Sequence, residues 1–122
     1  MKIVEMNAGT KVDYELNGYK LTFNDELTIR LDKYQRDYEV VKDIMADNEG
    51  FLVIGDGRFY VAQVVIPETQ YDETVEMVEK TEIDPESGEE VTKEVEEITR
   101  TKIALNTDDV ELRLFSIDGM NI

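Results

Sequence analysis

The sequence predicts an α+β fold, in which a mainly antiparallel β-sheet of meanders and hairpins carries one amphipathic helix. Apolar and polar residues alternate with period two through most of the chain, which is the pattern of strands with one buried face. The segment from Lys33 to Ala46 has the clearest helical spacing. Strands precede and follow this segment without strand–helix–strand alternation, so we expect about seven to nine strands in a single domain of residues 1–122.

The first part of the chain predicts a meander of short strands. Alternating apolar residues occur at 3–6, 12–16, 19–23 and 27–31. Between the second and third of these runs, Asn17-Gly18 is a strong hairpin signal, because both residues accept the positive φ of a type I′ turn. Consecutive runs are therefore expected to pair as neighbouring strands.

The period changes at Asp32, which can cap a helix with Gln35 in the reciprocal position three residues later. An apolar stripe at helical spacing follows, and Gly50 ends the segment. We expect an amphipathic helix from Lys33 to Ala46, packed across the sheet with its tyrosine rings buried. The stripe consists of Tyr34, Tyr38, Val41 and Met45, widened by Val40 and Ile44.

Two apolar runs after this segment predict the central hairpin of the core. They cover residues 51–54 and 59–66 and are joined by Gly55-Asp56-Gly57. The joining segment lacks the alternating oxygen ligands and the final glutamate of a calcium loop, so we interpret it as a tight turn. Pro67 ends the second run, and a last strand is expected within residues 110–117.

An acidic stretch from Glu68 to Glu97 holds 13 of the 29 acidic residues of the chain and only two basic ones. The turn sequence Asp84-Pro85-Glu86-Ser87-Gly88-Glu89 lies at its centre and predicts that the chain reverses there. Threonines on both flanks favour strands, whereas Val91, Val95 and Ile98 have helical spacing.

Three structures fit this stretch: a β-hairpin, a pair of helices and a disordered segment. We favour a projecting acidic β-hairpin near residues 71–103, with a bulge near Glu96-Glu97. A two-stranded ribbon is only marginally stable by itself, so its tip should be mobile unless a partner or a neighbouring subunit covers it. The residues predicted to make that contact are Tyr71, Val75, Met77, Ile83, Val91, Val95 and Ile98.

The chain contains no cysteine and no histidine, which removes thiolate nucleophiles, imidazole bases and the usual ligands of zinc, copper and iron. We therefore expect no catalytic residue, no metal site and no cofactor, and we predict that the protein is not an enzyme. Asp56, Asp108 and Asp109 occupy turn positions that favour aspartate for backbone reasons. The clusters Asp72-Glu73 and Glu96-Glu97 lack a ligand cage and are interpreted as a solvated charged surface.

The formal net charge of −16 repels nucleic-acid phosphates and anionic lipids. We expect no direct binding to nucleic acid or to a membrane. The expected partners are proteins with basic patches or further copies of this chain. No signal-peptide pattern and no apolar run of about 18 residues are present, which predicts a soluble cytoplasmic protein.

Three segments of the second half resemble small proteins encoded among the structural genes of tailed phages and prophages. They are the Ile-Pro-aromatic segment IPETQY, the turn DPESGEEV and the ending KIALNTDDVELRLFSID. The resemblance covers about Val65 to Asp118 and includes no catalytic residue. It implies a virion-associated protein, placed in the host cytoplasm or in the assembled virion.

Two hypotheses about function follow. In the first, the protein is a non-enzymatic structural or assembly protein of the phage or prophage type, and its acidic β-arm contacts another protein chain by strand addition or charge complementarity. In the second, the acidic surface imitates nucleic acid and inhibits a host protein that binds DNA or RNA.

Overall fold

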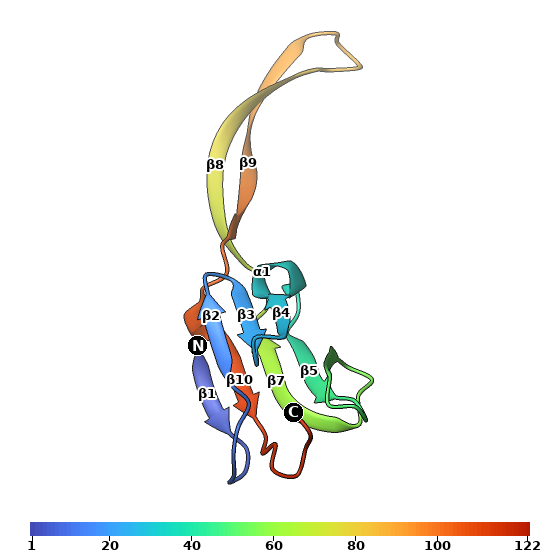
Figure 1. Cartoon of the computed structure of the whole chain (residues 1–122). Helices are drawn as coiled ribbons and strands as arrows, with labels where there is room; N and C mark the ends of the chain where they lie inside the picture. Colours follow the sequence, from blue (N-terminus) through green and yellow to red (C-terminus); the bar gives the residue numbers. More distant parts are fainter. The chain divides into compact units, whose positions relative to one another are not determined.

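The computed structural model describes all residues, Met1–Ile122, and divides them into two compact units. The first unit, called the body, comprises residues 1–69 and 104–122, and the second, called the hairpin, comprises residues 70–103. Strands dominate both units, and Figure 1 labels most of the strands in chain order. The predicted mainly antiparallel β-sheet is confirmed, whereas the assignment to a single domain stays a prediction.

The body contains a five-stranded sheet with the strand order β1-β10-β7-β5-β6. Strands β1 and β10 are parallel, and every other neighbouring pair is antiparallel. The bounds are β1 Lys2–Glu5, β10 Glu111–Leu114, β7 Phe59–Ile66, β5 Val40–Ala46 and β6 Leu52–Ile54. A single 3-10 turn, η1 at Thr107–Asp109, precedes β10.

A second, three-stranded sheet of the body is the predicted meander. It consists of β2 Tyr14–Asn17, β3 Lys20–Phe23 and β4 Leu27–Arg30, all antiparallel. The turn between β2 and β3 lies one residue later than expected, because Asn17 pairs with Lys20 and Gly18 carries the positive φ of 59°. Glycine at the first central position fits a type II′ turn rather than the predicted type I′.

Both sheets of the body contribute to one hydrophobic core. Pairs such as Leu112 with Val64 and Ile44 with Ala62 put buried side chains from neighbouring strands on one face of the five-stranded sheet. Strands β2–β4 lie over this face in Figure 1 and add Leu21, Phe23 and Ile29 to the core. No residue of the hairpin belongs to it.

The predicted helix from Lys33 to Ala46 is wrong. Only one helical turn forms, α1 at Leu31–Tyr34, and Val40–Ala46 is strand β5. The expected stripe is not buried as a unit, since Tyr38 is 65% and Val41 46% exposed. As a strand between β7 and β6, β5 makes ladder hydrogen bonds that a helix at this position would not make, and its β-branched valines and isoleucine favour that conformation.

The predicted cap and the predicted core hairpin also need correction. Asp32 does not cap α1, because the helix begins at Leu31 with Arg30 in the N-cap position; the Asp32 carboxylate accepts hydrogen bonds from Arg30 instead. The buried Gln35 side chain instead donates to the carbonyl oxygen of Pro67 at 3.2 Å. Strands β6 and β7 exist as predicted but do not pair with each other, since β5 lies between them.

Candidate functional site

The hairpin consists of two long strands that pair without interruption. Strand β8 covers Gln70–Ile83 and β9 covers Glu90–Ile103, 14 residues each, so each strand spans about 45 Å. The register runs continuously from Gln70 opposite Ile103 to Ile83 opposite Glu90. The predicted β-hairpin is therefore confirmed, and the bulge predicted near Glu96-Glu97 is wrong, because both glutamates keep regular partners in this register.

The turn that closes the hairpin is the one expected from Asp84 to Glu89. The Asp84 amide donates to the carbonyl oxygen of Glu89 at 2.8 Å, and the Gly88 amide donates to that of Asp84 at 2.7 Å. The Asp84 carboxylate accepts from the amide of Glu86, and Gly88 has a φ of 71°. Aspartate and glycine hold this reversal through backbone chemistry, as their positions predict.

The register divides the seven predicted contact residues between the two faces of the ribbon. Side chains of directly opposite residues share a face, and successive residues alternate. Val75 lies opposite Ile98, and Met77 follows on the same face, so these three residues form a contiguous group, called here the apolar patch. Their exposed fractions are 57%, 59% and 58% for Val75, Met77 and Ile98.

The other predicted contact residues lie apart from the apolar patch. Tyr71 and Ile83 are on the same face but nearer the two ends of the ribbon, whereas Val91 and Val95 are on the opposite face. Sequence reasoning missed Val78, which lies opposite Val95 and is half-buried with it. The alternation of β8 gave no signal for Val78, because the other even-numbered residues of this strand are polar, and its partner could only be identified from the register.

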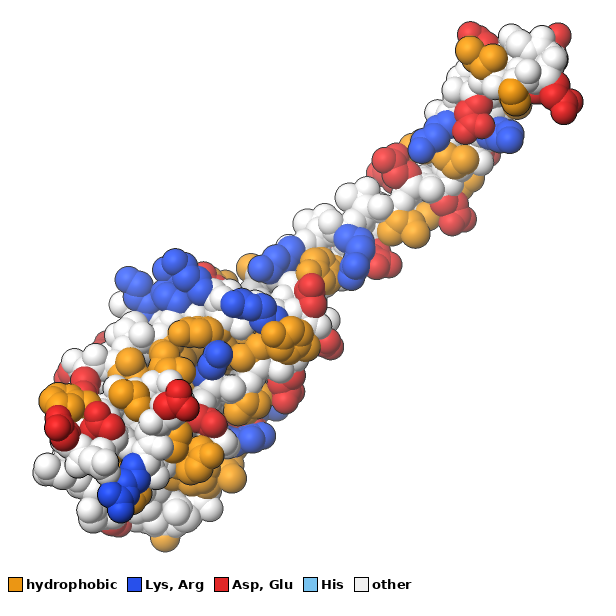
Figure 2. All heavy atoms as spheres, turned by 90° about the vertical axis from the view of Figure 1, so that its right-hand side faces the viewer, with side chains coloured by type: hydrophobic (Ala, Val, Ile, Leu, Met, Phe, Trp, Pro, Cys, Tyr) orange, Lys and Arg blue, Asp and Glu red, His pale blue; other side chains and the backbone are white.

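Carboxylates are spread along both strands of the hairpin. The hairpin holds 12 acidic and four basic residues, and Figure 2 shows red, blue and orange side chains interleaved along it. Three cross-strand pairs carry like charges: Glu76 with Glu97, Glu79 with Glu94 and Lys80 with Lys93. Directly opposite like charges destabilise a strand pair, so this surface is not arranged to stabilise an isolated ribbon.

One group of charges in the hairpin does stabilise it locally. The guanidinium of Arg100 lies 3.2 Å from the carboxylate of Glu73 and 4.4 Å from the centre of the Tyr71 ring. An exposed ion pair contributes little, and a cation over an aromatic face adds a comparable amount. These contacts order the end of the ribbon distant from the turn, next to the apolar patch.

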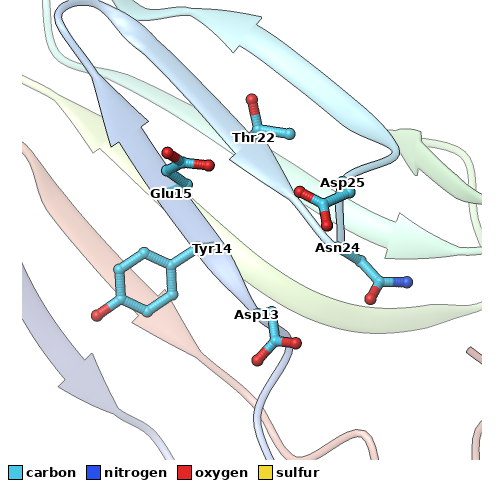
Figure 3. A pocket seen from close by; sticks show the side chains of 6 residues that line it. All are labelled: Asp13, Tyr14, Glu15, Thr22, Asn24 and Asp25. Atoms are coloured by element: carbon cyan, nitrogen blue, oxygen red, sulfur yellow. The ribbon is translucent and has the colours of Figure 1, made fainter.

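A shallow pocket on the three-stranded sheet is the second candidate (Figure 3). Its volume is about 140 Å³, and its lining includes three carboxylates, from Asp13, Glu15 and Asp25. Glu15 lies on β2, Asp13 comes just before it, and Asp25 lies in the turn between β3 and β4; Figure 3 shows that the three carboxylates do not converge on one point. No group of three or more acidic side chains in the chain is arranged to hold a metal ion.

A more open pocket of about 320 Å³ is lined by Asn17, Tyr19, Lys20 and Arg30. The guanidinium group that lines this pocket is already paired, because Arg30 lies 2.8 Å from the Asp32 carboxylate. The hydrogen bond from Arg30 lowers the pKa of Asp32 and raises that of Arg30, so both groups stay charged at neutral pH. This ion pair is an internal contact of the body.

None of the helical segments has the length and apolar character that a membrane span requires. Comparisons with protein-family models, with curated proteins and with solved structures find no match for this chain. The candidate site therefore rests on the chemistry of the residues themselves, and the hairpin with its apolar patch is the candidate that this chemistry favours most.

Proposed function

We propose that this chain is a non-enzymatic structural or assembly protein of the phage or prophage type that contacts a protein partner through the hairpin. The observation that carries the proposal is the apolar patch. Val75, Met77 and Ile98 are each more than half exposed on one face of a ribbon that adds nothing to the hydrophobic core. A two-stranded ribbon gains stability when another chain covers such a face.

The charges around the apolar patch indicate the chemistry of the partner. Glu73, Glu79 and Glu96 lie on the same face as the patch, and the hairpin as a whole has a net formal charge of −8. Interfaces combine an apolar centre with a polar rim, and complementary charge in the rim directs association. The partner is therefore a protein whose contact surface has an apolar centre flanked by lysine or arginine.

Nucleic-acid mimicry is the alternative, and the carboxylates on both faces along the ribbon support it. Two features of the hairpin favour the assembly function over it. The Lys80–Lys93 pair interrupts the negative charge near the turn, and the apolar patch interrupts it nearer the other end. A phosphate backbone has neither interruption.

A shortened variant tests the proposal. Replacing residues 75–98 by Asn-Gly joins Thr74 to Thr99, which are directly opposite in the register, through a two-residue hairpin turn. The variant and the full chain are each co-expressed with the products of the adjacent genes. We expect the full chain to form a salt-sensitive complex with one of them and the shortened variant to lose it.

A matched pair of variants locates the contact on one face. Changing Val75, Met77 and Ile98 together to threonine removes the apolar patch while it keeps length, charge and strand propensity. Changing Val78, Val91 and Val95 to threonine does the same on the opposite face. The first variant should weaken the complex much more than the second.

Two results would contradict the assembly function. A shortened variant that still forms the complex would remove the hairpin from the contact. A complex that is displaced by duplex DNA, and that the threonine variants leave intact, would support mimicry instead.

A further inference from the structure

The hydrogen-bond pattern of the hairpin shows which backbone groups point outward. The pair of Asp84 and Glu89 continues the register of the ribbon, and the amide of Asp84 donates to Glu89. Antiparallel pairs alternate between hydrogen-bonded and non-hydrogen-bonded positions. The even-numbered residues of β8 therefore bond to β9, whereas the odd-numbered ones, including Glu73, Val75 and Met77, direct their amide and carbonyl groups away from it.

These outward groups form an open strand edge of unusual length. The edge strands of the body are β1, β6, β2 and β4, and none exceeds four residues. Short edges protect a sheet from pairing with other chains, as do prolines and bulges. Strand β8 has 14 residues, no proline and no bulge, and Glu73 to Met77 are exposed.

The two edges of the hairpin differ in charge. Strand β8 has five acidic residues and one lysine, a net charge of −4, whereas β9 has four acidic and three basic residues, a net charge of −1. Between Asp72 and Glu79, each face beside the β8 edge carries two carboxylates. Glu73 and Glu79 flank Val75 and Met77 on one face, and Asp72 and Glu76 lie on the other.

We propose that the open edge of β8 from Asp72 to Glu79 is the docking site for one extended segment of the partner protein, added as a third strand. The segment combines apolar and basic residues, because its side chains meet Val75 and Met77 on one face and carboxylates on both faces. This inference rests on the proposed contact through the hairpin and identifies the edge and the chemistry of the partner.

A model peptide tests the edge directly. The probe is a capped peptide of about eight residues that alternates lysine and valine, added to the full chain. We expect the outward amides of Glu73, Val75, Met77 and Glu79 to become protected from hydrogen exchange, while those of Glu94, Glu96 and Ile98 remain unprotected. Absence of binding, or protection on β9, would overturn the proposal.

An N-methylated control separates strand addition from charge attraction. Methylating the peptide amides that face β8 keeps the charge and the side chains but removes the donors of the new ladder, and should weaken binding at least about tenfold. Equal binding of both peptides would show that charge attraction alone binds them to the chain, which contradicts strand addition at the β8 edge. Concentration-dependent protection of the same amides without peptide would identify a second copy of the chain as the occupant and would also contradict the proposal.

Two proline variants provide matched controls in the chain itself. Val75→Pro removes an outward amide of β8, and Ile98→Pro removes an outward amide of β9 at the directly opposite position. Neither change removes a hydrogen bond between β8 and β9. We expect Val75→Pro to weaken peptide binding at least about tenfold and Ile98→Pro to weaken it only about twofold. Equal losses would overturn the assignment to β8.

Charge reversals keep the test decisive if a proline variant does not fold. The double variants Glu76→Lys/Glu79→Lys and Glu94→Lys/Glu97→Lys change the same net charge at directly opposite positions. The β8 variant should lose more affinity for the peptide than the β9 variant, and equal losses would contradict docking at the β8 edge. If the losses are equal and the threonine variant of the apolar patch still abolishes the partner complex, the proposed docking site on β8 is wrong and the proposed function remains.

Discussion

The body and the hairpin are both built from antiparallel strands, but different interactions hold them together. Strands of the body have three to eight residues and bury side chains in a shared core, whereas the two strands of the hairpin have 14 residues each and bury almost nothing. Burial of apolar surface is the main favourable contribution to folding, so the shorter strands belong to the more stable unit. The length of the hairpin strands therefore adds exposed edges and faces rather than buried surface.

Hydrogen exchange should reveal the largest difference between the two units. Amides of the central strand β7, such as that of Val64, should exchange at least about a thousandfold more slowly than the inward amide of Val78 in β8, because β7 opens only when the body unfolds. Within β8, the amides of Glu76 and Val78 should in turn exchange more slowly than those of Val75 and Met77. Similar protection in β7 and β8 would contradict the conclusion that the body is the more stable unit.

Substituting the same residue type in both units should give the next largest effect. Ile66 is fully buried at the end of β7, and Ile98 is 58% exposed in β9. We expect Ile66→Ala to lower the free energy of unfolding by about 2–5 kcal/mol, through lost burial and the cavity that remains. Ile98→Ala should change it by less than about 0.5 kcal/mol. Urea titration followed by tyrosine fluorescence measures both values.

The stability of the body should depend on pH through Asp118. Hydrogen bonds from Thr10 lower the pKa of this carboxyl below its ordinary value of 3.8. A lowered folded pKa contributes stability that is present above the unfolded pKa of 3.8 and is lost as the pH falls through the folded pKa. The urea midpoint of Asp118→Asn should therefore lie below that of the unmodified chain at neutral pH and converge with it at pH values below 3.8. If the two urea midpoints differ by the same amount at neutral pH and below pH 3.8, the stability that Asp118→Asn loses does not come from the lowered pKa of Asp118.

The smallest effect is expected from a charge change in the hairpin. Lys80 lies directly opposite Lys93, so Lys80→Glu converts a repulsive pair into an attractive one and should stabilise the local strand pairing by about 0.2–1 kcal/mol. Slower exchange of the inward amides near Lys80, with an unchanged urea midpoint of the body, would agree with this. A shift in the midpoint of the body would show that the two units are coupled energetically.

Local chemistry made the turns and most strands predictable. The reversal at Asp84 to Glu89 and the hairpin it closes follow from residues that are adjacent in the sequence. The same holds for the meander of β2–β4, apart from the one-residue shift at Gly18. In these segments, the residues that determine the backbone conformation are close together in the chain.

The helix prediction failed because β5 fits two periods at once. Val40, Ile44 and Ala46 lie on its core-facing side, but Lys42 occupies the position between them, opposite Val64, and breaks the alternation in the sequence. The structure accommodates this lysine because its ammonium group lies 4.9 Å from the centre of the Tyr34 ring. Neither the ring contact nor the neighbours β7 and β6 can be inferred from residues 33–46 alone.

The sequence by itself determined that the chain forms mainly antiparallel strands, where most of its turns lie and which long segment forms the acidic hairpin. Tertiary structure decided that β5 is a strand between β6 and β7, and the cross-strand register decided that Ile98 joins Val75 and Met77 while Val91 and Val95 face the other way. The physical reason is that turns depend on neighbouring residues, whereas a strand position or a shared face depends on which distant backbone supplies the hydrogen bonds.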